Sequence, residues 1–317
     1  MKLLLANPRG FCAGVDRAIE IVKKVLEEKG SPIYVKHEVV HNKIVVKELE
    51  NLGAVFVEEI SDIPKGETVI YSAHGVSKTV VTDSNTKDLD IFDATCPLVS
   101  KVHAEVSKYS TMGLDCILIG HANHPEVEGT MGQFNFSQGG KMHLVENEED
   151  IDKLQIDNPI GVAYVTQTTL SVDDTQIIIQ KLKNKFDNII GPKSEDICYA
   201  TQSRQDAVKQ LALECDLVLV VGSTTSSNSN RLREIAERSG VESYLIDGSK
   251  DIKLEWFEGK NSIGLTSGAS APEHLVQEVM SFISSHFDLE KDIDSEREDE
   301  GVYFNLPKKI KAFGTSQ

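Results

Sequence analysis

The amino-acid sequence predicts an α/β protein built of three related units with small, mostly parallel sheets. Strand-like runs alternate with amphipathic helical runs along the chain, which is the pattern of α/β units. Cys12, Cys96 and Cys198 each stand at or just before the start of a helical run. A similar succession of segments follows each of these cysteines, so the chain carries an internal repeat.

The first segment of each unit is a helical run, in which apolar residues recur at spacings of three and four. Pro97, directly after Cys96, suits the first position of a helix because its missing N–H is not needed there. Gly30 and Gly113 follow the first two helical runs and are typical helix stops.

Each unit continues with strand-like runs that end in polar loops. Each unit has a first run, then a short apolar run, then a second run. These lie at 32–42, 54–59 and 68–77 in the first unit, and at 116–129, 142–147 and 162–171 in the second. In the third unit they lie at 216–230, 243–247 and 262–272. A further strand-like run precedes each cysteine, at 1–12, 89–96 and 188–198. We expect the N-terminal strand to join the third unit, because nothing after Phe287 supplies the strand that this unit needs.

The repeat decides the domain organisation. A length of 317 residues alone suggests roughly two domains. The repeat instead predicts three units, at residues 13–96, at 97–196, and at 197–285 together with 1–12. Residues 286–317 form a C-terminal tail with an acidic beginning, which either frays or docks back on the body as a strand.

Composition and charge narrow the class of function. The net charge of −17 argues against nucleic acid or an anionic membrane surface as a partner. The apolar N-terminal run is too short for a signal peptide and no later run is long enough to span a bilayer, so we expect a cytoplasmic protein. Five cysteines without a Cys-x-x-Cys pair favour a metal site or catalysis over disulfides.

Cys12, Cys96 and Cys198 are predicted to share a metal site. Ligands of parallel α/β sheets bind at the carboxyl ends of the strands, where three units can aim their loops at one centre. The dipole and amide groups of a helix start favour the thiolate, which binds metal. Three thiolates suit an iron–sulfur cluster with one iron left open to substrate, since four cysteines are the usual closed set. Cys116 and Cys215 lie in apolar segments and are expected to be core residues.

Other polar loop residues predict an anion site. His41, His74 and His124 fall in the predicted site loops, and histidine can neutralise an anion near neutral pH. The third unit offers loops rich in serine and asparagine that run into helices, where hydroxyl and amide groups bind phosphate. Ordinary helix capping is the alternative explanation for these serines and asparagines.

Glu126 and Glu128 are candidates for a proton donor. A carboxyl group near a cluster and a bound anion would have a raised pKa and could carry a proton. Thr168 could relay that proton. The alternative is a solvated pair of acids beside a helix start, and the pattern does not choose between the two glutamates.

The motifs of the chain resemble those of the LytB/IspH family of 4-hydroxy-3-methylbut-2-enyl diphosphate reductases. They are NPRGFCAGV, HEVVHN, SAHGVS, FDATCPLV, GHANHPEVEGT, TQTTLSVDDT, DICYAT, SSNSNRL and GASAP, and they run from residue 2 to about 285. The resemblance implies three α/β domains around a central cavity. It also implies a two-electron reductive dehydroxylation that yields isopentenyl diphosphate, dimethylallyl diphosphate and water, the last step of the methylerythritol phosphate route to isoprenoids.

The resemblance further implies roles for single residues. Cys12, Cys96 and Cys198 would hold one [4Fe–4S] cluster per chain, whose open iron site meets the substrate hydroxyl. Glu126 rather than Glu128 would be the proton donor, and a ferredoxin or flavodoxin would supply the electrons. The substrate-binding set, in which Thr168 and His124 also serve catalysis, would be His41, His74, His124, Thr168, Ser226, Ser227, Asn228 and Ser270.

Two other functions fit three cysteines. A zinc hydrolase with a bound water predicts zinc, no colour and activity without a reductant. A non-enzymic iron–sulfur carrier or sensor predicts a cluster but no requirement for Glu126. The phosphate-suited loops around the cysteines argue against the carrier, and the missing Cys-x-x-Cys spacing argues against zinc.

Overall fold

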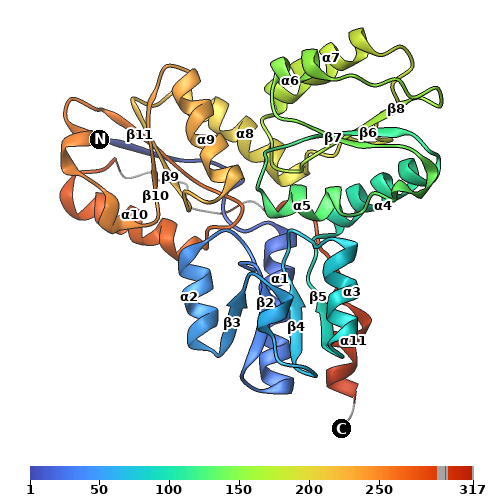
Figure 1. The fold of residues 1–317 in the computed structure, drawn as a ribbon. Helices are drawn as coiled ribbons and strands as arrows, with labels where there is room; N and C mark the ends of the chain where they lie inside the picture. Colours follow the sequence, from blue (N-terminus) through green and yellow to red (C-terminus); the bar gives the residue numbers. More distant parts are fainter. Residues whose placement is uncertain (291–296, 298, 316–317) are drawn as a thin grey trace. The chain divides into compact units, whose positions relative to one another are not determined.

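The computed structural model describes residues 1–290, 297 and 299–315. Within them it shows three small parallel sheets flanked by helices, which confirms the predicted α/β class (Figure 1). The chain divides into two compact units. The first comprises Met1–Asp16, Val40–Glu48 and Tyr199–Tyr303, and the second comprises Arg17–Val39, Leu49–Cys198 and Phe304–Gln317. The boundaries that the repeat predicts for three units stay a prediction.

The first unit contains a sheet of order β1-β11-β9-β10, in which every strand pair is parallel. The N-terminal strand pairs with β11, so that Leu3 lies opposite Ile263. Helices α8 and α9 pack on one face of this sheet and α10 packs on the other. The elements are β1 (Lys2–Leu5), α8 (Tyr199–Ala212), β9 (Leu217–Val221), α9 (Ser227–Arg238), β10 (Glu242–Ile246), β11 (Ser262–Ser267) and α10 (Glu273–His286).

One sheet of the second unit has the order β3-β2-β4-β5, again with parallel pairs only. Its loop after β4 carries His74, and its last strand leads to Cys96. The elements are α1 (Ala13–Lys29), β2 (Ile33–Lys36), α2 (Lys43–Asn51), β3 (Ala54–Val57), β4 (Thr68–Tyr71), α3 (Lys78–Thr86) and β5 (Asp90–Asp93). Residues 13–16 of α1 and 43–48 of α2 belong to the first unit. Short 3-10 turns occur along the chain at η1 (Ile60–Asp62), η2 (Phe136–Gln138), η3 (Ser249–Asp251) and η4 (Leu254–Phe257).

The other sheet of the second unit has the order β7-β6-β8. Helices α4 and α5 cover one face, and α6 and α7 cover the other (Figure 1). Strands β6 and β8 are buried along their whole length, which explains why they are apolar runs rather than alternating patterns. The elements are α4 (Pro97–Thr111), β6 (Asp115–Ile119), α5 (Pro125–Met131), β7 (Met142–Val145), α6 (Glu148–Lys153), β8 (Val162–Thr166) and α7 (Val172–Lys185).

The segment before Cys198 differs from the sequence prediction. A strand was expected within 188–198, but the structure shows a single bridge between Ile190 and Ala163. Pro192 has no N–H to donate to a ladder, and the residues after it are mostly polar. This segment is therefore a loop, held by other contacts.

The described part of the tail docks without forming a strand. It ends in α11 (Lys308–Lys311) and η5 (Ala312–Thr315), and Arg17 Nε donates to the Asn305 carbonyl at 3.0 Å. The acidic residues 291–296 and 298 lie outside the described residues. None of the described helices combines the length and the apolar character that crossing a bilayer requires.

Candidate functional site

The three repeat cysteines occupy matching positions at helix starts. Cys12 directly precedes α1, Cys96 is the N-cap of α4, and Cys198 directly precedes α8. Each cysteine is partly buried. Pro97 occupies the first turn of α4, as the sequence predicts.

The backbone around these cysteines is also equivalent. Each cysteine N–H donates to a carbonyl in the loop that follows a parallel strand. The pairs are Cys12 to Ala269 after β11 at 3.2 Å, Cys96 to Ala73 after β4 at 3.0 Å, and Cys198 to Thr168 after β8 at 3.0 Å. The repeat in the sequence is therefore a repeat of the hydrogen bonds that fix each thiol.

The convergence of the three thiols stays a prediction. Cys12 belongs to the first unit, whereas Cys96 and Cys198 belong to the second. Among residues 1–290, 297 and 299–315, no three His, Cys, Asp or Glu side chains lie close enough together to hold a metal ion. Burial raises the pKa of the Cys12 thiol, against smaller opposing effects of the Val15 and Gly14 backbone, so this helix start alone does not favour the thiolate.

The remaining two cysteines are core residues, as predicted. Cys116 is fully buried in β6 against α4, and Cys215 packs beside α8 and β9. Burial raises the pKa of both thiols, that of Cys215 to about 12. Both thiols belong to hydrophobic core clusters of their sheets.

Glu126 lies in the first turn of α5 and its side chain is buried. His124 is the N-cap of this helix, and its Nδ1 accepts the Glu126 N–H at 3.2 Å. The Glu126 carboxyl group accepts the Thr168 N–H at 2.6 Å and the Thr168 hydroxyl at 3.0 Å. Glu128, two residues further on, is exposed. Of the two candidate acids, Glu126 is therefore the one whose carboxyl group is shown bonded to another predicted site residue in the described part of the chain.

Burial sets the proton affinity of Glu126. The side chain is only 3% exposed, and this burial raises its pKa to about 7 although both bonds from Thr168 lower it. A carboxyl group with this pKa is protonated in a large fraction of molecules at neutral pH. Glu126 can therefore both hold and release a proton under those conditions.

His74 and His124 face each other in the second unit. Their ring centroids are 5.9 Å apart in an edge-to-face arrangement, and the Ser72 hydroxyl lies 3.3 Å from His74 Nδ1. The loop of His74 approaches α5 so closely that a Cβ on Gly129 would lie 3.1 Å from the Gly75 carbonyl oxygen. Small residues at this contact let the His74 loop approach α5, the helix that carries Glu126 in its first turn.

The other predicted ligands gather in the first unit. The Ser270 hydroxyl donates to the His41 carbonyl at 3.0 Å, one residue after the Ala269 carbonyl that accepts from Cys12. Ser226 is the N-cap of α9, and Ser227 and Asn228 form its first turn. A Cβ on Gly268 would lie 3.5 Å from Asn228 Nδ2, so Asn228 borders the Ser270 loop.

Asn228 is the most informative of these residues. Its side chain is 4% exposed, yet among the described residues neither the amide nitrogen nor the amide oxygen has a hydrogen-bond partner. Leaving buried polar atoms without partners is unfavourable by about 1–3 kcal/mol each. A side chain in this state at a helix N-terminus is suited to a ligand that supplies the missing bonds.

Two buried arginines, which the sequence patterns do not predict, hold the Cys12 loop. Arg204 Nη2 donates to the Gly10 carbonyl at 2.8 Å and pairs with Glu300 at 2.9 Å. Arg9 Nη2 pairs with Glu273 at 2.9 Å. One feature of the sequence could have indicated this. Arg204 is a charged residue on the buried face of a helical run.

Comparisons with known proteins identify the family of the chain. The family model described as "LytB protein" matches residues 3–284. The 4-hydroxy-3-methylbut-2-enyl diphosphate reductase of Ectopseudomonas mendocina (strain ymp) is 58% identical over 98% of this chain and 99% of its own length. The enzyme of that name from Saccharophagus degradans is 56% identical over 98% of this chain and all of its own length.

Solved structures give the same result. The E-1-hydroxy-2-methyl-but-2-enyl-4-diphosphate reductase from Plasmodium falciparum matches with a TM-score of 0.91 and 42% identity, over 99% of this chain and 98% of that one. A second structure is titled as (E)-4-hydroxy-3-methyl-but-2-enyl diphosphate reductase, the terminal enzyme of the non-mevalonate pathway. It matches with a TM-score of 0.63 and 32% identity over 90% of this chain and all of that one. The family model and these relatives, each covering nearly the whole chain, show that it belongs to the LytB family.

Proposed function

We propose that this chain is a 4-hydroxy-3-methylbut-2-enyl diphosphate reductase. The reaction removes the allylic hydroxyl of that substrate with two electrons and protons, and it yields isopentenyl or dimethylallyl diphosphate plus water. The single observation that carries the proposal is the buried Glu126–Thr168 pair, with its pKa of about 7, beside two histidines and the loops of Cys96 and Cys198. The names of the relatives support the substrate and the reaction.

The residues fit a [4Fe–4S] cluster held by Cys12, Cys96 and Cys198. The matching hydrogen bonds of the three cysteine N–H groups support one shared role for these thiols, separate from the core role of Cys116 and Cys215. A buried thiol such as Cys12 becomes a stable thiolate when a metal ion binds, because the ion outweighs the effect of burial. When bound, a cluster with one iron not ligated by the protein supplies electrons and a Lewis acid for the hydroxyl oxygen.

Glu126 is the residue that provides the proton for the leaving hydroxyl group. Its carboxyl group is buried, and this burial keeps a proton on it in a large fraction of molecules near neutral pH. Thr168 fixes the carboxyl plane through two bonds, and its hydroxyl can pass the proton onward because a hydroxyl both donates and accepts. The N-cap bond from Glu126 N–H to His124 Nδ1 holds the His124 ring at the start of the helix that carries Glu126.

The diphosphate is bound by neutral donors and histidines. Asn228 offers an amide without partners at the start of α9, where the backbone N–H groups and the helix dipole favour an anion. Ser226, Ser227 and Ser270 add hydroxyl groups in the same unit, and His41 adds an imidazole. His74 completes this set from the second unit.

A ferredoxin or flavodoxin is the proposed electron donor. The cytoplasmic location expected from the sequence stays a prediction.

An anaerobic assay of the purified chain, with the allylic diphosphate and a reduced one-electron carrier, tests the proposal. We expect both isoprenoid diphosphates as products and no turnover without the reductant. Consumption of substrate without any reductant would instead support a hydrolase and contradict the proposal.

A further inference from the structure

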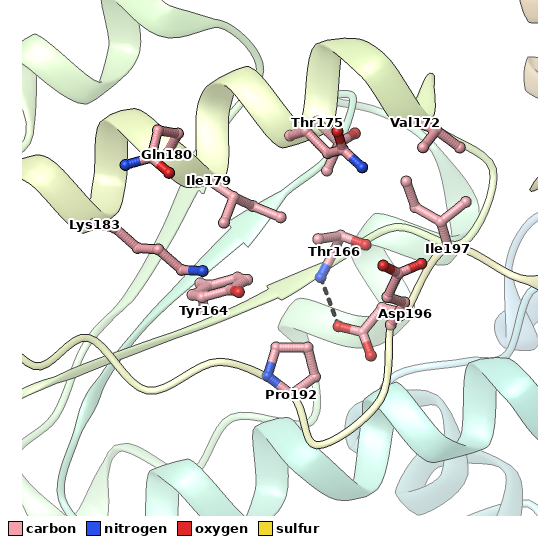
Figure 2. A pocket seen from close by; sticks show the side chains of 12 residues that line it. Tyr164, Thr166, Val172, Thr175, Ile179, Gln180, Lys183, Pro192, Asp196 and Ile197 are labelled. Carbon is pink, nitrogen blue, oxygen red and sulfur yellow. Dashed lines mark hydrogen bonds between the residues drawn. The ribbon is translucent and has the colours of Figure 1, made fainter.

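The loop that carries Cys198 lacks the strand pairing that holds the other two repeat cysteines. Cys12 and Cys96 follow strands β1 and β5, but the segment before Cys198 makes one isolated bridge at Ile190. A cavity of about 340 Å³ borders this segment, and Pro192, Asp196 and Ile197 line it (Figure 2). Apolar packing on that side is therefore incomplete, and something else must fix the position of Cys198.

A buried ion pair supplies that contact. Asp196 lies two residues before Cys198, its side chain has no exposed surface, and it pairs with Lys101 at 3.0 Å. The other carboxylate oxygen accepts the Thr166 N–H at 2.9 Å, at the end of β8 (Figure 2). Two residues further along both segments, Cys198 N–H donates to the Thr168 carbonyl at 3.0 Å.

Lys101 uses its full bonding capacity on this loop. Its ammonium group donates to the Ser194 carbonyl at 2.7 Å, to the Glu195 carbonyl at 2.9 Å and to Asp196. An ammonium group has three donors, so all of them act on three consecutive residues. Lys101 stands in α4, the helix that begins directly after Cys96.

A second carboxyl group completes the cluster. Glu105 lies one turn after Lys101 on α4 and also bonds Asp196. Burial, and then the charge of Asp196, raises the pKa of Glu105 to about 7. The buried side chain of Asp196 thus meets a cation, a backbone amide and a second carboxyl group, and the Lys101 and Glu105 side chains are partly buried.

From these contacts we infer that the Lys101–Asp196 ion pair is a positioning device that fixes Cys198 relative to the Cys96 helix and to the Glu126–Thr168 pair. One end of the pair is set by α4 and the other by β8, and the loop of Cys198 lies between them. We call the contacts of Lys101 and Asp196 with the Cys198 loop the clamp. The inference about positioning rests on the proposed role of Cys96 and Cys198 as metal ligands, whereas the clamp itself does not depend on a bound metal.

The test has two readouts in the full-length chain. One is the hydrogen-exchange rate of the Cys198 amide, and the other is the content, reduction potential and visible spectrum of the bound iron. In Asp196→Asn and Lys101→Met we expect the amide of Cys198 to exchange at least ~10-fold faster, because its segment opens locally. A peptide over Cys12 should not change. Asp115→Asn is the matched control, since Asp115 is also a buried carboxylate in this unit, paired with His143 at 2.8 Å at the other end of the sheet.

Lys101→Arg separates geometry from charge. A planar guanidinium cannot direct its donors at three converging acceptors as an ammonium group does, so we expect only partial recovery of protection at Cys198. Full recovery by arginine would overturn the three-donor explanation. Unchanged exchange at Cys198 in both Asp196→Asn and Lys101→Met would overturn the clamp.

The iron measurement tests the positioning role. In anaerobically purified protein we expect Asp196→Asn to bind less iron than Asp115→Asn, or to show a shifted reduction potential and visible spectrum. Faster exchange with an unaltered iron content, potential and spectrum would refute the positioning role. A wild-type chain that binds no iron, while exchange at Cys198 still responds to Asp196→Asn, would refute the proposed function and leave the clamp intact.

Discussion

Replacing Glu126 by glutamine tests the central chemical assignment. Glutamine keeps the shape of the side chain and an oxygen that can accept from Thr168, but it cannot donate a proton to a leaving group. General acid catalysis by a positioned side chain is worth about 10²–10⁴-fold in rate. We therefore expect kcat of Glu126→Gln to fall by that factor, while iron content and substrate affinity are retained.

The structure also gives the pH dependence. Burial raises the pKa of Glu126 from its ordinary value of 4.5 to about 7. This difference corresponds to ~3 kcal/mol at 1.36 kcal/mol per pKa unit. Because the folded-state pKa is raised, the protonated form is favoured by folding. The stabilising contribution of the bound proton is complete below pH 4.5 and is lost as the pH rises through about 7.

The assay is the anaerobic reductase rate between pH 5.5 and about 9, with Glu128→Gln as the matched control on the same helix. Glu128 is exposed, so its replacement should leave kcat and the pH profile unchanged. In the wild type, kcat/KM should fall above the pKa of the free acid, near 7, and this alkaline limb should be missing in Glu126→Gln. Wild-type turnover in Glu126→Gln, or an unaltered alkaline limb, would refute the assignment.

Three further predictions follow from the same contacts. Thr168→Val removes the 3.0 Å bond that lowers the pKa of Glu126, so the alkaline limb should move to higher pH, and Thr168→Ser should restore it. Gly75→Ala should lower the melting temperature more than Gly66→Ala. Both glycines have positive φ, but only at Gly75 would a Cβ lie 2.6 Å from a histidine ring, that of His103. Equal shifts in the two variants would exclude the clash. His74→Ala should weaken diphosphate binding by about 1.5–3 kcal/mol, as for a lost charge-assisted bond, and unchanged affinity would remove His74 from the site.

Local patterns in the sequence predicted much of the fold. The apolar periodicity and Pro97 place α4 directly after Cys96, and the structure shows Cys96 as its N-cap. The prediction of a strand before Cys198 was wrong. The apolar residues there are followed by Pro192, which has no N–H for strand pairing, and the segment makes one isolated bridge. The threefold hydrogen-bond pattern at the cysteines was not readable from sequence, although the repeat pointed to the residues involved.

The site could be predicted only where residue type alone suggests a role. Residue type alone left the choice between Glu126 and Glu128 open, and the family resemblance implied Glu126. The contact that distinguishes them in the structure comes from Thr168, which is 42 positions away. Arg204 and Asp196 were missed for the same reason. Charged residues are normally exposed, and only distant partners such as Gly10, Glu300 and Lys101 explain why these two are buried.

The most direct test of the account is the iron and acid-labile sulfide content of the anaerobically purified chain. We expect about four of each per chain, as a [4Fe–4S] cluster requires. Cys12→Ser, Cys96→Ser and Cys198→Ser should lose them, while Cys116→Ser and Cys215→Ser should keep them. Zinc in place of iron, or iron that persists in all three of the first variants, would contradict the account.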